Sequence, residues 1–167
     1  RGFMEQHMPD DGGSIPKTVR RLVEEKGSAV STISPDDLAV DAARMMAEEK
    51  IGVLVCCDDP TVVSGVISER DIVRVFAEHP EGVGTMLVHD VMTKDVQTCH
   101  MDDEISTAMA IMQTGGFRHL PVVDDGRLRA LISATDILMF YMKYASLNDR
   151  QVILAIILES GLVYPGG

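Results

Sequence analysis

Two stretches of the chain carry apolar residues at helical spacing, and each stretch follows a pair of aspartates. The apolar residues recur at positions i, i+3, i+4 and i+7, which places four side chains on one face of a helix. The two sets are Ala39, Ala42, Ala43 and Met46, and Ile105, Ala108, Met109 and Met112. Two amphipathic helices are therefore predicted, one in each half of the chain.

An apolar run that ends in two acids follows each predicted helix. The two runs are VLVCCDD at 53–59 and HLPVVDD at 119–125. Valine is frequent in both runs and turn residues follow them, so each is predicted to be a strand. Asp125-Gly126 is a strong signal for a hairpin turn into a second strand. Shorter strands are predicted ahead of the helices, at 29–33 and 95–99.

The segments after these runs also match, so the chain contains an internal repeat. Asp36 recurs as Asp102, a period of 66, and Gly65 aligns with Ala130, a period of 65. The period changes because the first copy carries one extra residue, which we place in its turn at 59–61. GVISERDIVRVF, starting at Gly65, matches ALISATDILMFY, starting at Ala130. Each copy is predicted to run strand, helix, strand, turn, strand, helix.

A copy of this size buries its hydrophobic faces poorly alone, so the two copies are expected to pack together about a pseudo-twofold axis. The fold class is then α+β, with two β-α-β-β-α units forming one module and two related clefts between them. We divide the chain into a lead-in that is disordered or a cloning remnant (1–15), a first motif (16–80), a linker (81–84), a second motif (85–145) and a C-terminal apolar helix with its tail (146–167).

The C-terminal segment 152–158, VILAIIL, is apolar almost all round. A helix with that composition has to be buried. Once two motifs have completed a core, the remaining place for such a helix is against another subunit. The sequence therefore predicts a homodimer.

Charge and cysteine content narrow the class of protein. The chain has 26 acidic and 15 basic residues, a net charge of −11. That balance argues against a nucleic-acid partner, because phosphate binding needs clustered cations, and against an anionic membrane surface. The N-terminus has no apolar signal-peptide core, and no apolar run approaches the roughly 18 residues of a membrane span. Three cysteines give no even disulfide set, so a reducing cytoplasm is expected.

Motifs for catalysis, metal binding and thiol chemistry are weak or missing. Cys56 and Cys57 lie in the first apolar run, and a switch between them is disfavoured because adjacent strand residues point to opposite faces. Cys99-His100 has no further cysteine or histidine at ligand spacing, so no metal site is expected. The sequence lacks a P-loop, a nucleophile elbow and a GxGxxG fingerprint. With no activated nucleophile–base pair either, the chain is not expected to be an enzyme.

A serine and an aspartate stand three residues apart where each copy passes from its last strand into its last helix. The pairs are Ser68 with Asp71 and Ser133 with Asp136. One interpretation is a capping box, in which the serine accepts from the N3 amide and the acid accepts from the serine amide. The other is a nucleotide site, because a helix N-terminus offers free amides to a phosphate and a carboxylate can accept both ribose hydroxyls. The two roles are compatible.

Four segments together resemble the CBS (cystathionine-β-synthase-type) motif pair and span about residues 16–145. Segment 65–72, GVISERDI, resembles the G-x-I-[ST]-x-x-D-[IL] signature, and 131–137, LISATDI, resembles its second copy. Segment 90–93, DVMT, resembles the D-[VI]-M-T opening, and 117–124, FRHLPVVD, resembles the R-H-[LI]-P-V-V-D segment. The resemblance implies a regulatory Bateman module that binds an adenine nucleotide between its motifs and acts on an effector protein in trans. AMP is the first choice, followed by ADP, ATP, NADH and S-adenosylmethionine.

The first copy departs from this pattern. Gly52-Val53 stands where the second copy has Arg118-His119, Val55 stands where the second copy has Pro121, and segment 18–22, TVRRL, lacks the D-x-M-T form. The two clefts are therefore expected to be unequal, with phosphate recognition concentrated where the Arg118-His119 pair reaches. The sequence leaves open which of the two aspartates lies beside that pair.

The resemblance also implies ligand contacts for individual side chains. Arg118 and His119 are expected to meet a phosphate, with lysines ahead of the first strands as further contacts. Gly52 would let a flat base approach the backbone, and Phe117 would cover a base. The expected ligand-binding residues are Lys26, Ile51, Gly52, Ser68, Arg70, Asp71, Lys94, Phe117, Arg118, His119, Ser133, Thr135 and Asp136. The alternatives are ordinary packing or solvent exposure for these side chains, and an interaction scaffold whose clefts have lost their ligand.

Overall fold

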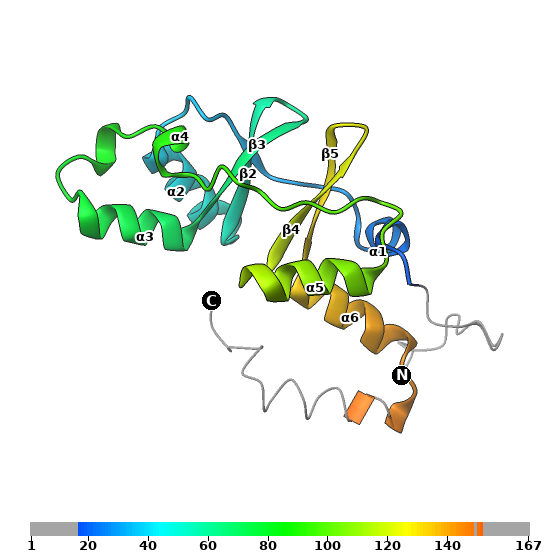
Figure 1. Cartoon of the computed structure of the whole chain (residues 1–167). Coiled ribbons are helices and arrows are strands. Elements are labelled where there is room, and N and C mark those ends of the chain that lie inside the picture. Colours follow the sequence, from blue (N-terminus) through cyan, green and yellow to red (C-terminus); the bar gives the residue numbers. More distant parts are fainter. Residues whose placement is uncertain (1–16, 149, 152–167) are drawn as a thin grey trace, which may run out of the picture.

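The structure is a computed structural model that describes residues 17–148, 150 and 151 of the 167-residue chain. The predicted lead-in at 1–15 and the predicted apolar helix at 152–158 lie outside the described residues. Within the described part the chain forms an α+β module of two similar halves (Figure 1), so the predicted fold class is confirmed.

The first half contains a three-stranded sheet with two helices. Its elements are β1 (Thr32–Ile33), α2 (Ala39–Glu49), β2 (Val53–Asp59), β3 (Val62–Ser68) and α3 (Glu69–Glu78). β1 runs parallel to β2, and β2 pairs antiparallel with β3. The face of α2 predicted from its apolar spacing is the buried one, since Ala39, Ala42 and Met46 are almost fully removed from solvent.

The second half repeats this arrangement with a smaller sheet. Its elements are α5 (Ile105–Gly115), β4 (His119–Asp124), β5 (Arg127–Ser133) and α6 (Ala134–Tyr144). β4 and β5 form an antiparallel pair. The strand predicted at 95–99 is reduced to one parallel bridge, in which the Cys99 amide donates to the Pro121 carbonyl at 3.0 Å. On α5, Met109 belongs to the predicted apolar face but is 48% exposed.

The helices that precede the two copies are exchanged between the halves. α1 (Val19–Lys26) buries its apolar face in the core of the second half, and α4 (Val88–Val91), which follows the 3₁₀ turn η1 (Val83–Thr85), buries its own in the core of the first. The backbone contacts match: the Val19 amide donates to the Asp103 carbonyl at 2.9 Å, and the Val88 amide to the Asp37 carbonyl at 2.8 Å. Each core is therefore completed by a segment that precedes the other copy.

The extra residue of the first copy lies in a strand, so its prediction in the turn is wrong. Both hairpins have two-residue turns, at 60–61 and 125–126, and both have one register irregularity beyond the fourth pair. β2 has a second irregularity between Cys57 and Asp59, which absorbs Asp58 as a bulge. In the second hairpin Asp125 and Gly126 have φ values of 51° and 71°, which fits the predicted tight hairpin turn.

The two hairpins lie side by side with their turns at the same end of the module, and α3 and α6 begin at the opposite end (Figure 1). Near the turns the Leu128 amide donates to the Thr61 carbonyl at 2.6 Å, and Arg127 Nη1 donates to Thr61 Oγ1 at 2.5 Å. Because these contacts join the hairpins at one end, the serine–aspartate junctions of both copies lie at the other end.

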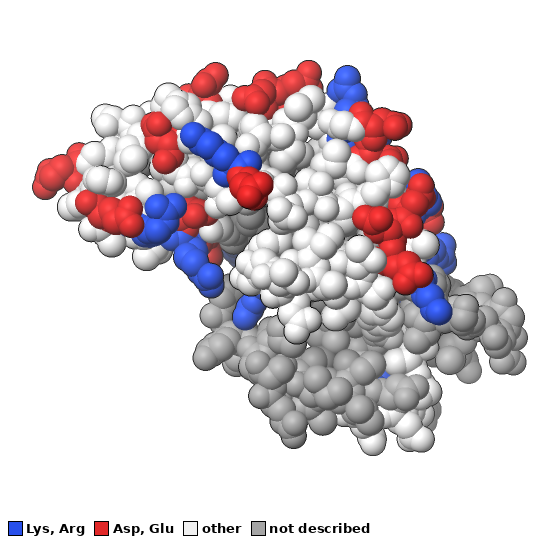
Figure 2. Space-filling view, viewed as in Figure 1, with Lys and Arg blue, Asp and Glu red and all other residues white. Residues whose placement is uncertain are grey.

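The charges on one face of the molecule are mixed in sign (Figure 2). On the face seen in Figure 2, basic side chains lie beside acidic ones along the outer edges, and the uncharged central area lies over α5, which has no charged residue. None of the helices within 17–148 and 150–151 is long and apolar enough to cross a membrane.

Candidate functional site

The serine–aspartate pairs form capping boxes at the start of α3 and α6, as one interpretation predicted. The Ser68 amide donates to Asp71 Oδ2 at 2.9 Å, and the Asp71 amide donates to Ser68 Oγ at 3.4 Å. The corresponding distances for Ser133 and Asp136 are 2.8 and 3.0 Å. Each box fixes its carboxylate at the mouth of a helix N-terminus, where an anion or a hydroxyl-bearing ligand can be held.

Asp136 is paired with a lysine from the exchanged helix α1. Lys26 Nζ lies 3.3 Å from Asp136 Oδ2 and donates to the Leu131 carbonyl at 2.7 Å. The two side chains are 23% and 30% exposed, so the pair is partly shielded from water. Because Lys26 ends the first helix of the chain and Asp136 lies in the first turn of α6, only the exchange of α1 and α4 between the halves brings them together.

Arg118 and His119 lie at the beginning of β4, in the same region. His119 pairs in register with Ser133, and the Arg118 carbonyl accepts from the Ala134 amide at 2.9 Å. The pKa of His119 is lowered, chiefly by desolvation, although the residue as a whole is exposed; Asp136 opposes this shift, while the positive charges of Arg118 and Lys26 add to it. The Arg118 side chain is exposed and has no ion pair among the described residues. The structure therefore places Asp136, Lys26 and Arg118 within electrostatic range of His119.

The surroundings of Asp71 differ although the backbone is the same. The Glu69 amide donates to the Gly52 carbonyl at 3.1 Å, as Ala134 does to Arg118, so Gly52 occupies the structural place of Arg118. Arg74, one turn along α3, lies 3.3 Å from Asp71 Oδ1 and donates to the Val91 carbonyl at 3.4 Å. Sequence reasoning missed Arg74, although its i+3 spacing from Asp71 is a known signal for a helical ion pair.

Several other predicted contacts have different surroundings. Ile51 packs on the core of the first half, and Phe117 packs on the core of the second, with its ring over Gly115. Arg70 and Thr135 are exposed on the first turns of α3 and α6. Their contacts with a ligand remain predictions. Of the predicted set, the structure brings together Lys26, Arg118, His119, Ser133 and Asp136.

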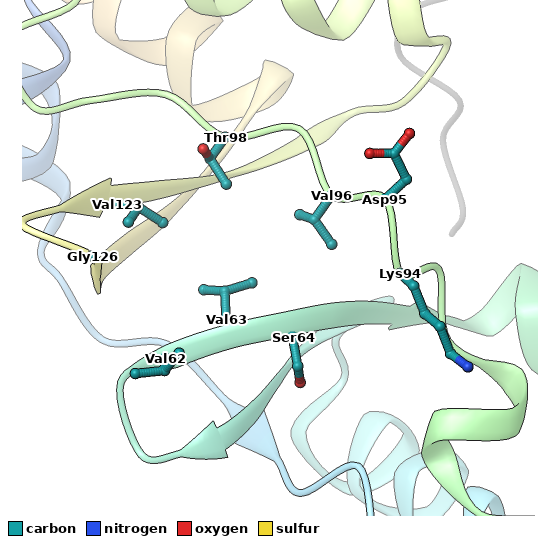
Figure 3. A pocket seen from close by; sticks show the side chains of 9 residues that line it. All are labelled: Val62, Val63, Ser64, Lys94, Asp95, Val96, Thr98, Val123 and Gly126. Carbon is teal, nitrogen blue, oxygen red and sulfur yellow. The ribbon is translucent and has the colours of Figure 1, made fainter.

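Two hollows are found in the described part of the molecule, and only the second borders one of these sites. One, of about 270 Å³, lies between the hairpins and segment 94–98, where Val63, Val96 and Val123 face a common space (Figure 3). Lys94 lies at its edge with the side chain directed away from these valines. The other, of about 220 Å³, lies between α1 and α6, next to the Lys26–Asp136 pair. Its lining residues are Leu22, Glu25, Lys26, Asp136, Met139, Phe140 and Lys143.

Burial makes the three cysteines unreactive. All three are buried, and burial raises the pKa of Cys56 and of Cys99 to about 12 and also raises the pKa of Cys57. A thiol with so high a pKa carries almost no nucleophilic thiolate near neutral pH. Across residues 17–148, 150 and 151, no group of three or more His, Cys, Asp or Glu side chains could hold a metal ion.

Comparison with known proteins identifies the two repeats. The CBS domain family model matches residues 20–78 and again residues 88–143. An uncharacterized 17.7 kDa protein of Acidianus ambivalens is 36% identical over 109 residues, covering 65% of this chain and 65% of that protein. The chain thus spans just under two thirds of that relative's length.

Solved structures share the fold. A CBS-domain containing protein from Agrobacterium tumefaciens superposes with a TM-score of 0.68 at 36% identity, covering 73% of this chain and 97% of its own. CBSX2, solved in complex with AMP, has a TM-score of 0.66 at 23% identity and covers 77% of this chain and 98% of its own. Another CBS domain pair, solved with 5′-methylthioadenosine and S-adenosylmethionine, gives 0.66 at 21% identity, with the same coverage. The last two likenesses concern the fold alone.

Proposed function

The chain belongs to the CBS-domain family, and from that premise we propose that it is a regulatory module that binds an adenine nucleotide at the Asp136 cleft. AMP is the preferred ligand, with ADP, ATP, NADH and S-adenosylmethionine behind it. The binding groups come from the second copy and from α1, which packs against it. The Asp71 cleft is the weaker of the two.

The observation that supports this proposal is the meeting of Lys26, Arg118 and His119 beside Asp136. Lys26 and Asp136 form an ion pair of 3.3 Å, and His119 lies within electrostatic reach of Asp136, Arg118 and Lys26. The chain has 26 acids and a net charge of −11, so three potential cations around one carboxylate are unusual in it. Such a cluster suits a ligand that carries both hydroxyls and a phosphate.

The roles follow from the chemistry of each group. The Asp136 carboxylate accepts from the ribose hydroxyls, and the capping box with Ser133 holds it in place. The Arg118 guanidinium is exposed and free to bind a phosphate bidentately. His119 joins when protonated and Lys26 adds a point charge. The adenine ring of the nucleotide would make the apolar contacts. Proteins of the same fold were solved with AMP, 5′-methylthioadenosine and S-adenosylmethionine.

The direct test is isothermal titration calorimetry on protein stripped of any co-purified ligand. AMP, ADP, ATP, NADH, S-adenosylmethionine and adenosine are titrated separately, and thermal unfolding is followed in parallel. A ligand present at 100 times its Kd adds about 2.7 kcal/mol to stability. For a chain of this size that raises Tm by about 5–10 °C. If no ligand gives a heat signal or moves Tm by more than about a degree, the proposal fails.

A second candidate function is an interaction scaffold with vestigial clefts. One observation favours it: both aspartates already have a cation, since Lys26 pairs with Asp136 and Arg74 pairs with Asp71. A scaffold needs no ligand to satisfy these groups. The same calorimetry separates the candidates, because a scaffold gives no signal with any nucleotide yet still forms its complex with a partner.

Regulation through a homodimer and an effector protein in trans, in the cytoplasm, forms part of the proposal. Exposed apolar side chains on the last helices support a protein partner: Val73 is 67% exposed and Phe76 59% on α3, and Met139 is 64% exposed on α6. Sedimentation at micromolar concentration should give a dimer, and Phe76→Glu should shift it toward monomer. A monomeric wild-type protein would remove the dimer from the proposal but leave nucleotide binding untouched.

A further inference from the structure

Lys26 forms an ion pair with Asp136, whose carboxylate would accept hydrogen bonds from a ribose. Its ammonium lies 3.3 Å from Asp136 Oδ2 and donates to the Leu131 carbonyl at 2.7 Å. It is the last residue of α1, where the helix dipole favours a cation. With 23% of its side chain exposed, Lys26 is held in the site but not sealed into it. Asp136 is therefore partly neutralised by a group that a ligand would have to displace or share.

Two ligand classes would meet this lysine differently. A nucleoside that approaches Asp136 with its ribose disturbs the Lys26–Asp136 pair and offers the ammonium no other anion. A nucleoside phosphate disturbs the same pair but supplies a new anion, so Lys26 can turn from carboxylate to phosphate. The same side chain then opposes the first ligand and assists the second.

We infer that Lys26 determines the selectivity of the Asp136 cleft for phosphorylated over unphosphorylated nucleosides, because it occupies Asp136 until a phosphate draws it away. This inference rests on the proposed function. It makes Lys26 more than a phosphate contact, since its removal should strengthen the binding of one ligand while weakening the binding of the other.

The neighbouring charges make this role particular to Lys26. Lys143 lines the same hollow, but its ammonium donates to Glu25 at 2.7 Å, and Tyr144 also contacts Glu25. Lys143 therefore has a partner that no ligand needs to displace. In the other half the cation on Asp71 is Arg74 of the same helix, one turn away, also bonded to the Val91 carbonyl.

The test is calorimetry with AMP and with adenosine on wild type, Lys26→Met, Lys26→Arg and Lys143→Met. Methionine keeps an unbranched apolar stem of similar length, so packing is largely preserved. In Lys26→Met, AMP should bind about tenfold more weakly, as expected for a lost charge-assisted bond. Adenosine should bind about two- to fivefold more tightly, the scale of a partly exposed ion pair. Lys26→Arg should keep the wild-type order, and Lys143→Met, with the same charge change in the same hollow, should alter neither ligand by more than about twofold.

Each other outcome contradicts the inference in its own way. Unchanged adenosine affinity with weaker AMP would make Lys26 a simple phosphate contact, and equal losses for both ligands would make it structural. A loss of AMP binding in Lys143→Met as large as that in Lys26→Met would assign the effect to overall charge. If wild type binds neither AMP nor adenosine, the proposed function itself has failed. Circular dichroism and Tm for every variant separate these results from misfolding.

Discussion

The two halves of the molecule place an aspartate at the same point of the same backbone and surround it with different charges. In both, the carboxylate closes a capping box at the start of the last helix. Around Asp136 stand Lys26, Arg118 and His119, brought from α1 and β4. Around Asp71 stands Arg74 from its own helix, while Gly52 fills the place of Arg118.

The difference lies in where the cation comes from. Arg74 follows Asp71 by three residues, so the two side chains meet along one helix, and Arg74 also donates to the Val91 carbonyl of α4. Lys26 is 110 positions before Asp136 (136 − 26) and reaches it only because the lead helices are exchanged. A local pair mainly stabilises its helix, whereas a pair that joins two segments can respond to a ligand between them. The comparison therefore supports the proposal that phosphate recognition belongs to the second half.

The largest expected effect comes from removing the Arg118 guanidinium, which has no counterpart in the first half. Arg118→Ala should weaken AMP about tenfold to a hundredfold and leave adenosine nearly unchanged, because a charge-assisted hydrogen bond contributes about 1.5–3 kcal/mol. The fold should not change, since only the Arg118 backbone is bonded to Ala134. Calorimetry with both ligands is the measurement. Arg129→Ala is the matched control, because Arg129 is also exposed and has no ion pair among the described residues. Equal losses for AMP and adenosine in Arg118→Ala would assign Arg118 to structure.

A second difference between the halves concerns how closely the exchanged segments, which contain α1 and α4, approach the sheets. A Cβ at Gly65 would lie 2.5 Å from Met92 Sδ and 2.9 Å from the Thr93 carbonyl oxygen, because Thr93 pairs with Val66 through two backbone bonds. Ala130 holds the matching place in the second half without such pairing. Gly65→Ala should cost about 1–3 kcal/mol, the usual range for overpacking. Ala130→Gly should cost about 0.5–1 kcal/mol through backbone entropy. Urea unfolding of both variants checks the order, and the reverse order would deny the close approach.

The pH dependence of AMP binding is a third way to separate the halves. Desolvation lowers the pKa of His119. The positive charges of Arg118 and Lys26 lower it further, and the negative charge of Asp136 opposes these effects. A bound phosphate would raise that pKa again, so AMP binding should take up a proton and tighten as the pH falls. We expect about a threefold gain between pH 8 and 6.5, near the ordinary pKa of histidine. Adenosine should show no such change, and His119→Gln should abolish it for AMP. Calorimetry in buffers of different ionisation enthalpy reports the proton directly, and a pH-independent AMP affinity would exclude His119.

The smallest effect is expected where α1 is held to the second half. Arg20 contacts Asp102 through Nε at 3.0 Å and Nη2 at 2.7 Å, with both side chains largely exposed. In the matching place on α4, His89 contacts Asp90 of its own helix. Arg20→Ala should therefore lower Tm only slightly, because an exposed ion pair is screened by water and adds little to stability. His89→Ala should cost still less, and hydrogen exchange should locate the Arg20 effect in α1. A loss of several kcal/mol would mean that this pair, and not apolar burial, holds α1 in place.

The sequence by itself determined the fold class and most of the elements. Apolar spacing placed α2 and α5, and the repeat placed both hairpins and the capping boxes at Ser68 and Ser133. These features are local, because each depends on residues within a few positions of one another. The same reasoning misplaced the extra residue of the first copy. The turn signal at 59–61 was local, but Asp58 bulges where cross-strand pairing allows it.

Only the tertiary structure decided which groups share a cleft. The sequence suggested Lys26 and Arg118 separately and left open which aspartate lies beside Arg118. Packing decided that Lys26 crosses to Asp136, because α1 buries its apolar face in the core of the second half. Hydrophobic patterns are short-range and repeat along the chain, so they can be read from one segment at a time. The pairing of distant charges depends on how whole segments dock. Two copies with similar apolar patterns are compatible with either docking until their cores are packed.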